Sequence, residues 1–210
     1  MRKKLLKYTI VVVVIALLAY KSVYIEKLSD VKAARSGSFD AAGFAWKLWK
    51  EQLPVRIREA VELPALLASL RANAEETFSR HGHSIGITNT ASFLVRASGV
   101  VTTIGEDEVV ILTGSGDSSL SVTIATEYVY GNTIRDASGL VDIRDFTNTM
   151  DLNTISEELN RIVRTTVLPS FKAKAQKGSR VEWTGALELN REHLNLEKIE
   201  IIPVELKMIP

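Results

Sequence analysis

Residues 131–163 read GNTIRDASGLVDIRDFTNTMDLNTISEELNRIV and separate two groups of predicted strands. The first half is rich in turn-forming and acidic residues and holds two Arg-Asp dipeptides, at 135–136 and 144–145. In the second half Leu152, Ile155 and Leu159 recur at helical spacing, opposite charged residues. The stretch therefore predicts a polar loop that leads into an amphipathic helix.

On both sides of this stretch, apolar and polar residues alternate with the period of a β-strand. Five such segments occur, from residue 92 onward, at 109–112, at 120–124, from residue 177 onward and at 198–208. Gly99 interrupts the first segment and would permit a bend there. Three strands, one helix and two strands is the element order of a small barrel of the oligonucleotide/oligosaccharide-binding (OB) kind. We expect an α+β chain with an OB-like barrel over 91–210.

A helical segment is predicted over 39–90, before the barrel. Apolar residues at helical spacing indicate a helix over 39–53, and Pro54 is expected to end it. Pro64 is expected to open the next helix, since proline is tolerated in a first helical turn. Asn73 is the expected N-cap of a third helix, which Gly82 would end.

The first 25 residues predict a membrane anchor. Four basic residues within 1–7 precede the apolar run YTIVVVVIALLAY at 8–20. A basic flank before such a run keeps the N-terminus in the cytoplasm and sends the following chain across the membrane. A cleaved signal peptide and a buried soluble helix are the alternatives. With the anchor at 1–25, residues 26–38 would form a juxtamembrane stalk.

Composition excludes several classes of function. Apolar residues make up 46% of the chain and charged residues 24%, as in a folded globular protein. There is no cysteine, which excludes disulfides, thiolate catalysis and cysteine zinc sites. The formal net charge of +1 gives no attraction to nucleic acid, so we expect no nucleic-acid partner.

Recognisable catalytic and cofactor motifs are absent from the sequence, and we expect no cofactor, no metal and no catalytic residue. His81 and His83 are close, but His193 is the one further histidine, and a zinc site needs three or four ligands. A role at the C-terminal end of a helix suits this pair better. A non-enzymatic protein is therefore favoured.

The polar loop supplies the candidate residues for binding a ligand or partner. They are Asn132, Arg135, Asp136, Arg144, Asp145 and Asn148. The arginines could donate to ligand oxygens, and the aspartates could accept from hydroxyls or orient the arginines. One alternative is an enzyme acting on envelope glycans, with Asp136 and Asp145 as paired carboxylates across a cleft. Another is a purely structural loop that fastens the helix to the barrel.

Several motifs give the chain a resemblance to a known family. They are GNTIRD at 131–136, DFTN at 145–148, the helix at 153–163, FD at 39–40, GH at 82–83 and IPV at 202–204. With these residues the chain resembles a bacterial domain-of-unknown-function family of predicted periplasmic lipoproteins. Members commonly carry a lipidated cysteine after the apolar run, where this chain has Tyr20. This departure from the family pattern excludes lipidation here and supports an uncleaved, single-pass anchor in the bacterial inner membrane.

The same resemblance implies a function in sugar uptake. Members often accompany components of sugar ABC transporters, so we expect a membrane-anchored periplasmic protein with a binding or accessory role. Its partners would be the inner membrane and either a transporter component or a small carbohydrate.

Overall fold

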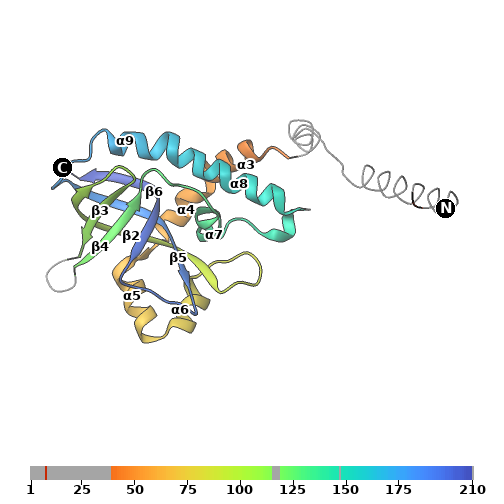
Figure 1. The fold of residues 1–210 in the computed structure, drawn as a ribbon, viewed down its shortest axis with the longest axis horizontal. Coiled ribbons are helices and arrows are strands. Elements are labelled where there is room, and N and C mark those ends of the chain that lie inside the picture. The colour runs from red at the N-terminus through yellow and green to blue at the C-terminus, as the bar shows by residue number, and fades with distance from the viewer. Residues whose placement is uncertain (1–7, 9–38, 115–118, 147, 210) are drawn as a thin grey trace. The chain divides into compact units, whose positions relative to one another are not determined.

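The computed structural model describes Tyr8 and residues 39–114, 119–146 and 148–209. The chain divides into two units, Met1–Asp40 and Ala41–Pro210. The second unit contains all the helices and strands considered below, and Figure 1 shows its β-barrel with helices packed around it.

The predicted anchor at 1–25 and the stalk at 26–38 lie outside the described residues, apart from Tyr8. No helix within the described part of the chain is both long enough and apolar enough to cross a bilayer. The predicted domain boundaries at residues 25, 38 and 90 stay predictions.

Five strands form a closed barrel, which confirms the predicted strand count. They are β2 (Thr90–Ile104), β3 (Glu108–Thr113), β4 (Leu120–Ala125), β5 (Arg180–Asn190) and β6 (Ile199–Ile209). Around the barrel the order is β2-β3-β4-β6-β5, and β5 pairs again with β2. β4 and β6 run parallel, and the other neighbours in the barrel run antiparallel. The long helical connection between β4 and β5 confirms the predicted helix between the third and fourth strands.

β2 is long enough to pair with two neighbours. It pairs with β5 from Thr90 to Val100 and with β3 from Gly99 to Ile104. A Cβ added at Gly99 would lie 2.4 Å from the carbonyl oxygen of Leu112 on β3. A side chain there would push β3 away, so the position where β2 changes partner requires glycine.

The barrel interior is filled by apolar residues of the five strands. Its buried members include Phe93, Val95, Ile111, Val122, Ile124, Val181, Trp183 and Ile201. Burying a side chain of this size contributes about 1.5–3 kcal/mol, so the core supplies most of the stability. Helices α5 (Leu63–Ala72) and α6 (Ala74–His81) extend this core (Figure 1), and Phe78 of α6 meets Phe93 edge-on at 5.2 Å.

The structure confirms the predicted boundaries of α5 and α6. Pro64 lies in the first turn of α5. The Asn73 side chain accepts from the Glu76 N–H at 3.1 Å, which caps α6, and Gly82 follows its last residue. A two-residue strand before α5, β1 (Val61–Glu62), pairs in parallel with β2 and was not predicted.

The prediction that Pro54 ends the first helix is wrong. Helix α3 (Ala41–Lys47) continues through a π-helical turn, η1 (Leu48–Gln52), into α4 (Leu53–Arg58). The Leu53 N–H bonds to the carbonyl of Leu48, five residues earlier. Proline lacks an N–H, and its ring collides with the carbonyl four residues before it in a regular α-helix. The wider π turn relieves this collision, and the helix continues.

A π-helical turn before a proline occurs a second time among the described residues. Helix α8 (Thr149–Ile162) passes through a π turn, η4 (Val163–Val167), into α9 (Leu168–Lys172), which begins with a Leu-Pro dipeptide like α4. The Leu168 N–H bonds five residues back, to Val163. Pro169 therefore does not end the helix.

The predicted loop at 131–148 is partly helical. It contains α7 (Thr133–Ser138) and a 3-10 turn, η3 (Ile143–Asp145). Helix α7 packs on the outer face of β2 and β5, buries Ile134, and ends at Gly139 with a φ of 62°. Six residues are too few to display a helical period, which is why the sequence indicated only a loop.

Candidate functional site

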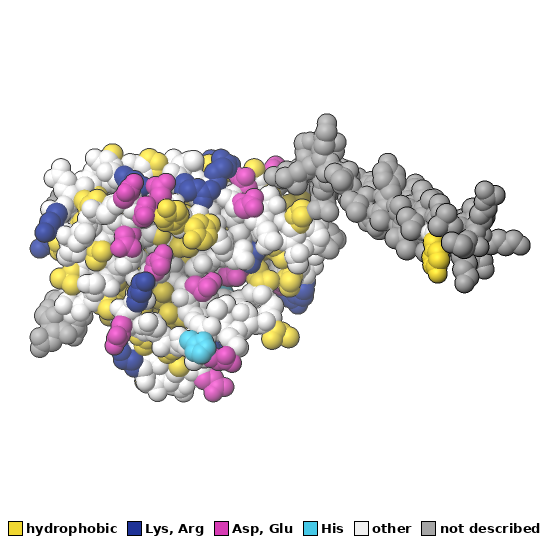
Figure 2. Space-filling view, in the orientation of Figure 1, with side chains coloured by type: hydrophobic (Ala, Val, Ile, Leu, Met, Phe, Trp, Pro, Cys, Tyr) yellow, Lys and Arg dark blue, Asp and Glu magenta, His cyan; other side chains and the backbone are white. Residues whose placement is uncertain are grey.

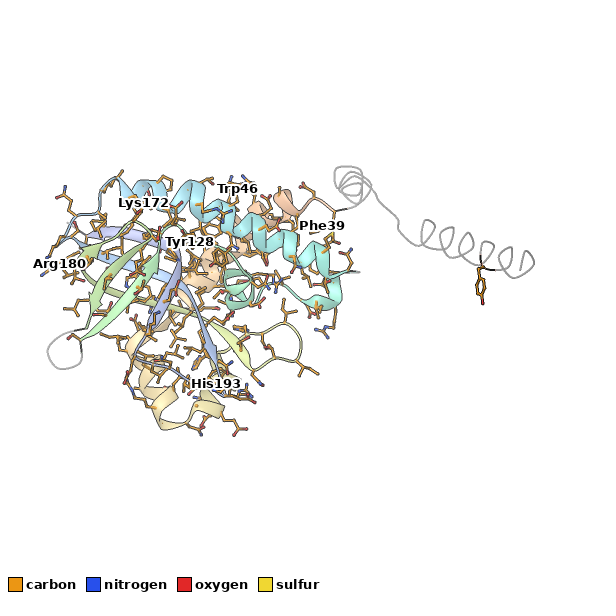
Figure 3. The ribbon with its side chains drawn as sticks, viewed as in Figure 1. Phe39, Trp46, Tyr128, Lys172, Arg180 and His193 are labelled. Atoms are coloured by element: carbon orange, nitrogen blue, oxygen red, sulfur yellow. The ribbon has the colours of Figure 1, made fainter. Side chains whose placement is uncertain are left out.

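An open groove of about 630 Å³ lies on the outer surface of the barrel, between α7, the start of β2 and the strands β5 and β6. Its polar lining comprises Thr88, Thr90, Tyr128, Tyr130, Asn132, Thr133, Arg135, Asp136, Glu188 and Glu200. Figure 3 places Tyr128 on the face turned to the viewer, and Figure 2 shows hydrophobic and acidic side chains on that face. We call this hollow the tyrosine groove.

The groove lies where two strands of the barrel separate. The β5–β6 ladder ends at the pair Ala186/Ile202, beyond which β5 continues beside β2 and β6 continues beside β4. Glu188 and Glu200 each lie two residues beyond that last pair. We call the place where β5 and β6 separate the fork. Because side chains two residues apart share one face of a strand, both glutamates project outward, on opposite sides of the fork.

Two exposed tyrosines form one wall of the groove. Tyr128 is 61% exposed and Tyr130 is 69% exposed, whereas Val129 between them is 1% exposed. In an extended segment alternate side chains point to opposite sides, so burial of Val129 turns both rings to the solvent on the same side. Two adjacent exposed rings at the edge of a groove offer more apolar area than isolated surface aromatics do.

The tyrosine segment is fastened from behind by the helical connection. The Arg164 Nη1 group donates to the carbonyl oxygen of Val129, and the Asn160 Nδ2 group donates to that of Gly131 at 2.8 Å. Both bonds go to main-chain atoms, so they fix the path of the backbone and leave the tyrosine rings free. The backbone that carries the rings is thereby ordered before any ligand arrives, which lowers the entropy cost of binding.

A buried ion pair lies against the groove. Arg135 is 4% exposed; its Nε donates to Asp136 Oδ1 at 2.7 Å, and its Nη1 donates to the carbonyl oxygen of Leu152 at 3.2 Å. No described residue accepts a hydrogen bond from Nη2. Burial raises the pKa of Asp136, and the hydrogen bond and charge of Arg135 oppose that rise.

The structure brings together three of the six candidate residues. Asn132, Arg135 and Asp136 all line the tyrosine groove. Asn132 is exposed at the start of α7, and Asp136 additionally borders a neighbouring cavity of about 310 Å³. Their predicted role in ligand or partner binding stays a prediction.

The other three candidates are not part of the groove lining. Arg144 binds Asp142, with Nε 2.9 Å from Oδ2, and not the adjacent Asp145, which corrects the expected pairing. This hydrogen bond lowers the pKa of Asp142 to about 2. The Asn148 side chain accepts from the Asp151 N–H at 3.0 Å and so caps α8.

The two carboxylates of the alternative enzyme hypothesis are not neighbours in a cleft. Asp136 lines the tyrosine groove and the cavity beside it, and Asp145 lines neither of them. Asp136 is instead bound to Arg135, while Asp145 is exposed in η3. This arrangement gives no support to a pair of carboxylates acting across one glycosidic bond.

His83 belongs to a structural contact between α4 and the end of α7. Arg56 donates through Nε to the carbonyl oxygen of Ser138 at 2.9 Å, and its Nη2 lies 3.3 Å from His83 Nε2. Burial lowers the pKa of His83, and the charges of Arg56 and His81 lower it further, which keeps the ring neutral. Within the described residues, no three potential ligands are grouped around a metal position.

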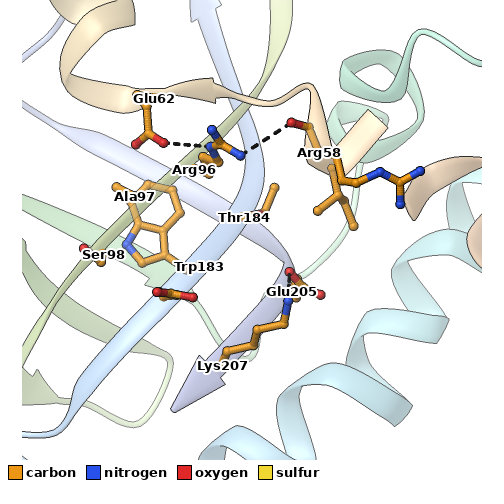
Figure 4. Close-up of a pocket in the computed structure, with 11 residues that line it drawn as sticks. Arg58, Glu62, Arg96, Ala97, Ser98, Trp183, Thr184, Glu205 and Lys207 are labelled. Carbon is orange, nitrogen blue, oxygen red and sulfur yellow. Dashed lines mark hydrogen bonds and ion pairs between the residues drawn. The ribbon is translucent and has the colours of Figure 1, made fainter. Parts of the chain in front are cut away.

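A second cavity, of about 370 Å³, lies between α4, β1 and the outer face of β2, β5 and β6 (Figure 4). Its charges compensate one another. Arg96 Nε donates to Glu62 at 2.7 Å, and Lys207 Nζ lies 2.9 Å from a Glu205 carboxylate oxygen. Trp183 contributes to this lining, but its ring is buried in the barrel core. The tyrosine groove is therefore the better candidate for ligand binding.

Four groove residues were missed by the reasoning from sequence. Tyr128 and Tyr130 precede the polar stretch, and Glu188 and Glu200 lie on strands far away in the chain. The one local signal was the pattern Tyr-Val-Tyr-Gly at 128–131, which equally suits an edge strand. The convergence of the four depends on the fork between β5 and β6, which no local pattern reveals.

The comparisons with known proteins agree with this architecture. The family model described as "Predicted periplasmic lipoprotein (DUF2291)" matches residues 13–207. The chain belongs to this family. The membership confirms the resemblance read from the sequence, and the description fits a membrane-associated periplasmic protein. No curated protein matches the chain.

A solved structure shows the same fold. An OB-fold protein (TM0957) from Thermotoga maritima is 24% identical, with a TM-score of 0.72 over 82% of this chain and 99% of that one. The OBody AM1L10 bound to hen egg-white lysozyme is 16% identical, with a TM-score of 0.29 over 65% of this chain and 88% of that one. The likeness to the Thermotoga protein confirms the OB-like barrel.

Proposed function

We propose that this family member is a non-catalytic, membrane-anchored periplasmic binding protein that holds a small carbohydrate in the tyrosine groove. The observation that carries the proposal is the pair of exposed tyrosine rings, borne on a hydrogen-bonded backbone beside polar side chains. A sugar ring presents C–H groups on its faces and hydroxyls around its edge. Aromatic rings suit the faces, and a few placed polar groups suit the hydroxyls.

Each part of the groove has a distinct role in this proposal. Tyr128 and Tyr130 pack against a face of the sugar. Asn132 donates and accepts with its side-chain amide, and the Arg135–Asp136 pair offers a donor and an acceptor close together. Such adjacent groups match the alternating donors and acceptors of neighbouring hydroxyls.

The proposed place of action is the periplasmic face of the inner membrane. A single-pass anchor at 1–25 with a cytoplasmic N-terminus would hold the barrel there, next to a sugar ABC transporter. The periplasmic description of the family and the chain's basic, apolar N-terminal sequence support this placement.

Direct binding tests the proposal. A monosaccharide has about 12 non-hydrogen atoms, and about 0.3 kcal/mol from each gives a Kd of about 2 mM. Saturation-transfer NMR on the full chain in detergent should therefore detect a bound sugar from a panel of hexoses, hexosamines and pentoses. The double variant Tyr128→Ala/Tyr130→Ala should lose the signal. The matched control Tyr128→Phe/Tyr130→Phe keeps both rings and should retain it.

Failure of every sugar to bind the wild type would contradict the carbohydrate assignment. Equal binding to the wild type and the alanine double variant would show that the site lies elsewhere.

The transporter association is tested separately. The tagged full chain, cross-linked in membranes of its own bacterium, should capture a subunit of a sugar ABC transporter that mass spectrometry identifies. The control is a tagged variant with an unrelated periplasmic domain in place of residues 41–210. Capture of the same subunit by both forms, or by neither, would refute the accessory role and leave the sugar site intact.

A further inference from the structure

The tyrosine groove carries an excess of negative charge. Glu188 and Glu200 are exposed on opposite sides of the fork, and neither forms an ion pair with a described residue. The positive charge of Arg135 is matched by Asp136 at 2.7 Å. Two carboxylates are therefore available to a ligand.

The second feature of the groove is a hydrogen-bond donor, the guanidinium group of Arg135. The Arg135 guanidinium is almost fully buried, and its Nε and Nη1 atoms are bound to Asp136 and Leu152. Nη2 donates to no described residue, and it is not among the buried donors that lack a partner. A hydroxyl oxygen in the groove can accept a hydrogen bond from it.

We infer that the ligand of the tyrosine groove is an amino sugar, meaning a carbohydrate that carries a free ammonium group. The inference rests on the proposed carbohydrate site and narrows its ligand class. Glu188 and Glu200 accept hydrogen bonds from the ammonium group, and Arg135 donates to a hydroxyl oxygen. Tyr128 and Tyr130 pack against the ring, where their electron-rich faces also attract the cation.

The two tyrosine rings, the two glutamates and the Arg135 donor together distinguish an amino sugar from related ligands. A neutral hexose can stack on the tyrosines but leaves both glutamates without a cation. An N-acetylated hexosamine has lost the positive charge, and a uronic acid brings a carboxylate beside two others. The expected order of affinity is therefore amino sugar, then neutral sugar, then acidic sugar.

Matched sugar pairs test this order on the full chain in detergent. Titration calorimetry would compare glucosamine with glucose, galactosamine with galactose, and mannosamine with mannose at neutral pH. The amino member of the pair that binds should be about tenfold tighter, the gain expected from one ammonium between two partly exposed carboxylates. The preference should shrink as salt concentration rises.

Glutamine variants locate the source of the preference. Glu188→Gln/Glu200→Gln should lose most of the preference for the amino sugar over its neutral partner. The control Glu51→Gln/Glu182→Gln removes the same number of charges from exposed positions outside the groove and should keep the preference. Thermal melting of all forms checks that each is folded.

Each remaining outcome overturns the inference. Equal affinity for the amino and neutral members would refute the ammonium preference and leave the proposed carbohydrate site standing. A preference that survives in Glu188→Gln/Glu200→Gln would place the source of selectivity outside the fork. Failure of all six sugars to bind would reject both the amino sugar and the carbohydrate site.

Discussion

Replacing Arg135 with methionine is expected to lower the free energy of unfolding by about 3 kcal/mol at neutral pH. Methionine fills a similar length without charge, so the loss comes from electrostatics and not from a cavity. Arg135 is 4% exposed, and the Asp136 side chain, 15% exposed, would lose its counter-charge at 2.7 Å. Breaking a buried pair from one side typically costs about 3–5 kcal/mol, and the residual exposure of Asp136 favours the lower value.

The loss should also depend on pH, with a defined sign. Burial already raises the pKa of Asp136 above that of the unfolded chain, and removal of Arg135 takes away the two interactions that oppose this rise. A carboxyl with a higher pKa in the folded state destabilises the fold at pH values above that pKa. The penalty disappears as the pH falls towards the unfolded value and the carboxyl is protonated. Each further unit of pKa corresponds to about 1.4 kcal/mol at neutral pH.

Urea unfolding of the full chain, followed by tryptophan fluorescence at about pH 7.5 and about pH 4.5, measures both effects. Arg80→Met is the matched control, because that side chain is 67% exposed and should change stability by less than about 0.5 kcal/mol. Arg135→Met/Asp136→Asn should recover part of the loss. A loss below about 1 kcal/mol at pH 7.5, or an equal loss at both pH values, would refute a buried, charge-dependent role for this pair.

Three further predictions concern the segments around the groove. Gly139→Ala should destabilise the protein more than Gly131→Ala in thermal melting. Both glycines have positive φ, of 62° and 82°. A Cβ at residue 139 would lie 2.9 Å from an imidazole atom, whereas a Cβ at residue 131 would meet open space. Asn148→Ala should cost about 1 kcal/mol in urea unfolding through the lost α8 cap, and a neutral result would show that the cap is dispensable. By NMR titration the pKa of Asp142 should be about 2 and should rise towards 3.8 in Arg144→Met; an unchanged value would contradict their pairing.

The barrel could be predicted because its strands carry their information locally. Val95 and Ala97 on β2, like Val181 and Trp183 on β5, are separated by a charged residue, and that period survives in a single sequence. The count of strands and the helix between the third and fourth followed from it. The family resemblance agreed with this pattern and was confirmed independently.

The helical features that the sequence did not predict depend on hydrogen bonds and packing, and not on local residue preference alone. Pro54 and Pro169 are helix breakers by their intrinsic geometry, and only the hydrogen bonds five residues apart in the preceding turns make them compatible with a helix. Helix α7 is too short for a periodic pattern and is stabilised by packing on β2 and β5.

Only part of the candidate site could be predicted, because its other residues come together through the tertiary fold. Arg135 and Asp136 stood out because a run of polar residues in an otherwise well-patterned chain was visible in the sequence. Tyr128 did not, because an exposed tyrosine and a buried one look alike until the position of Val129 is known. Glu188 reaches the groove only through the fork between two strands, a property of the closed barrel.

The contacts that hold the tyrosine segment do not involve the tyrosine rings, so ligand recognition and fold stability depend on different residues. Arg164 and Asn160 bind main-chain oxygens, and Val129 supplies the buried side chain, so the fold needs nothing from the rings at 128 and 130. Those two positions can change freely among related proteins while the scaffold remains intact. Descendants of one ancestral barrel could thus acquire different ligands by exchanging two surface side chains, and a designer could alter selectivity there without first repairing the core.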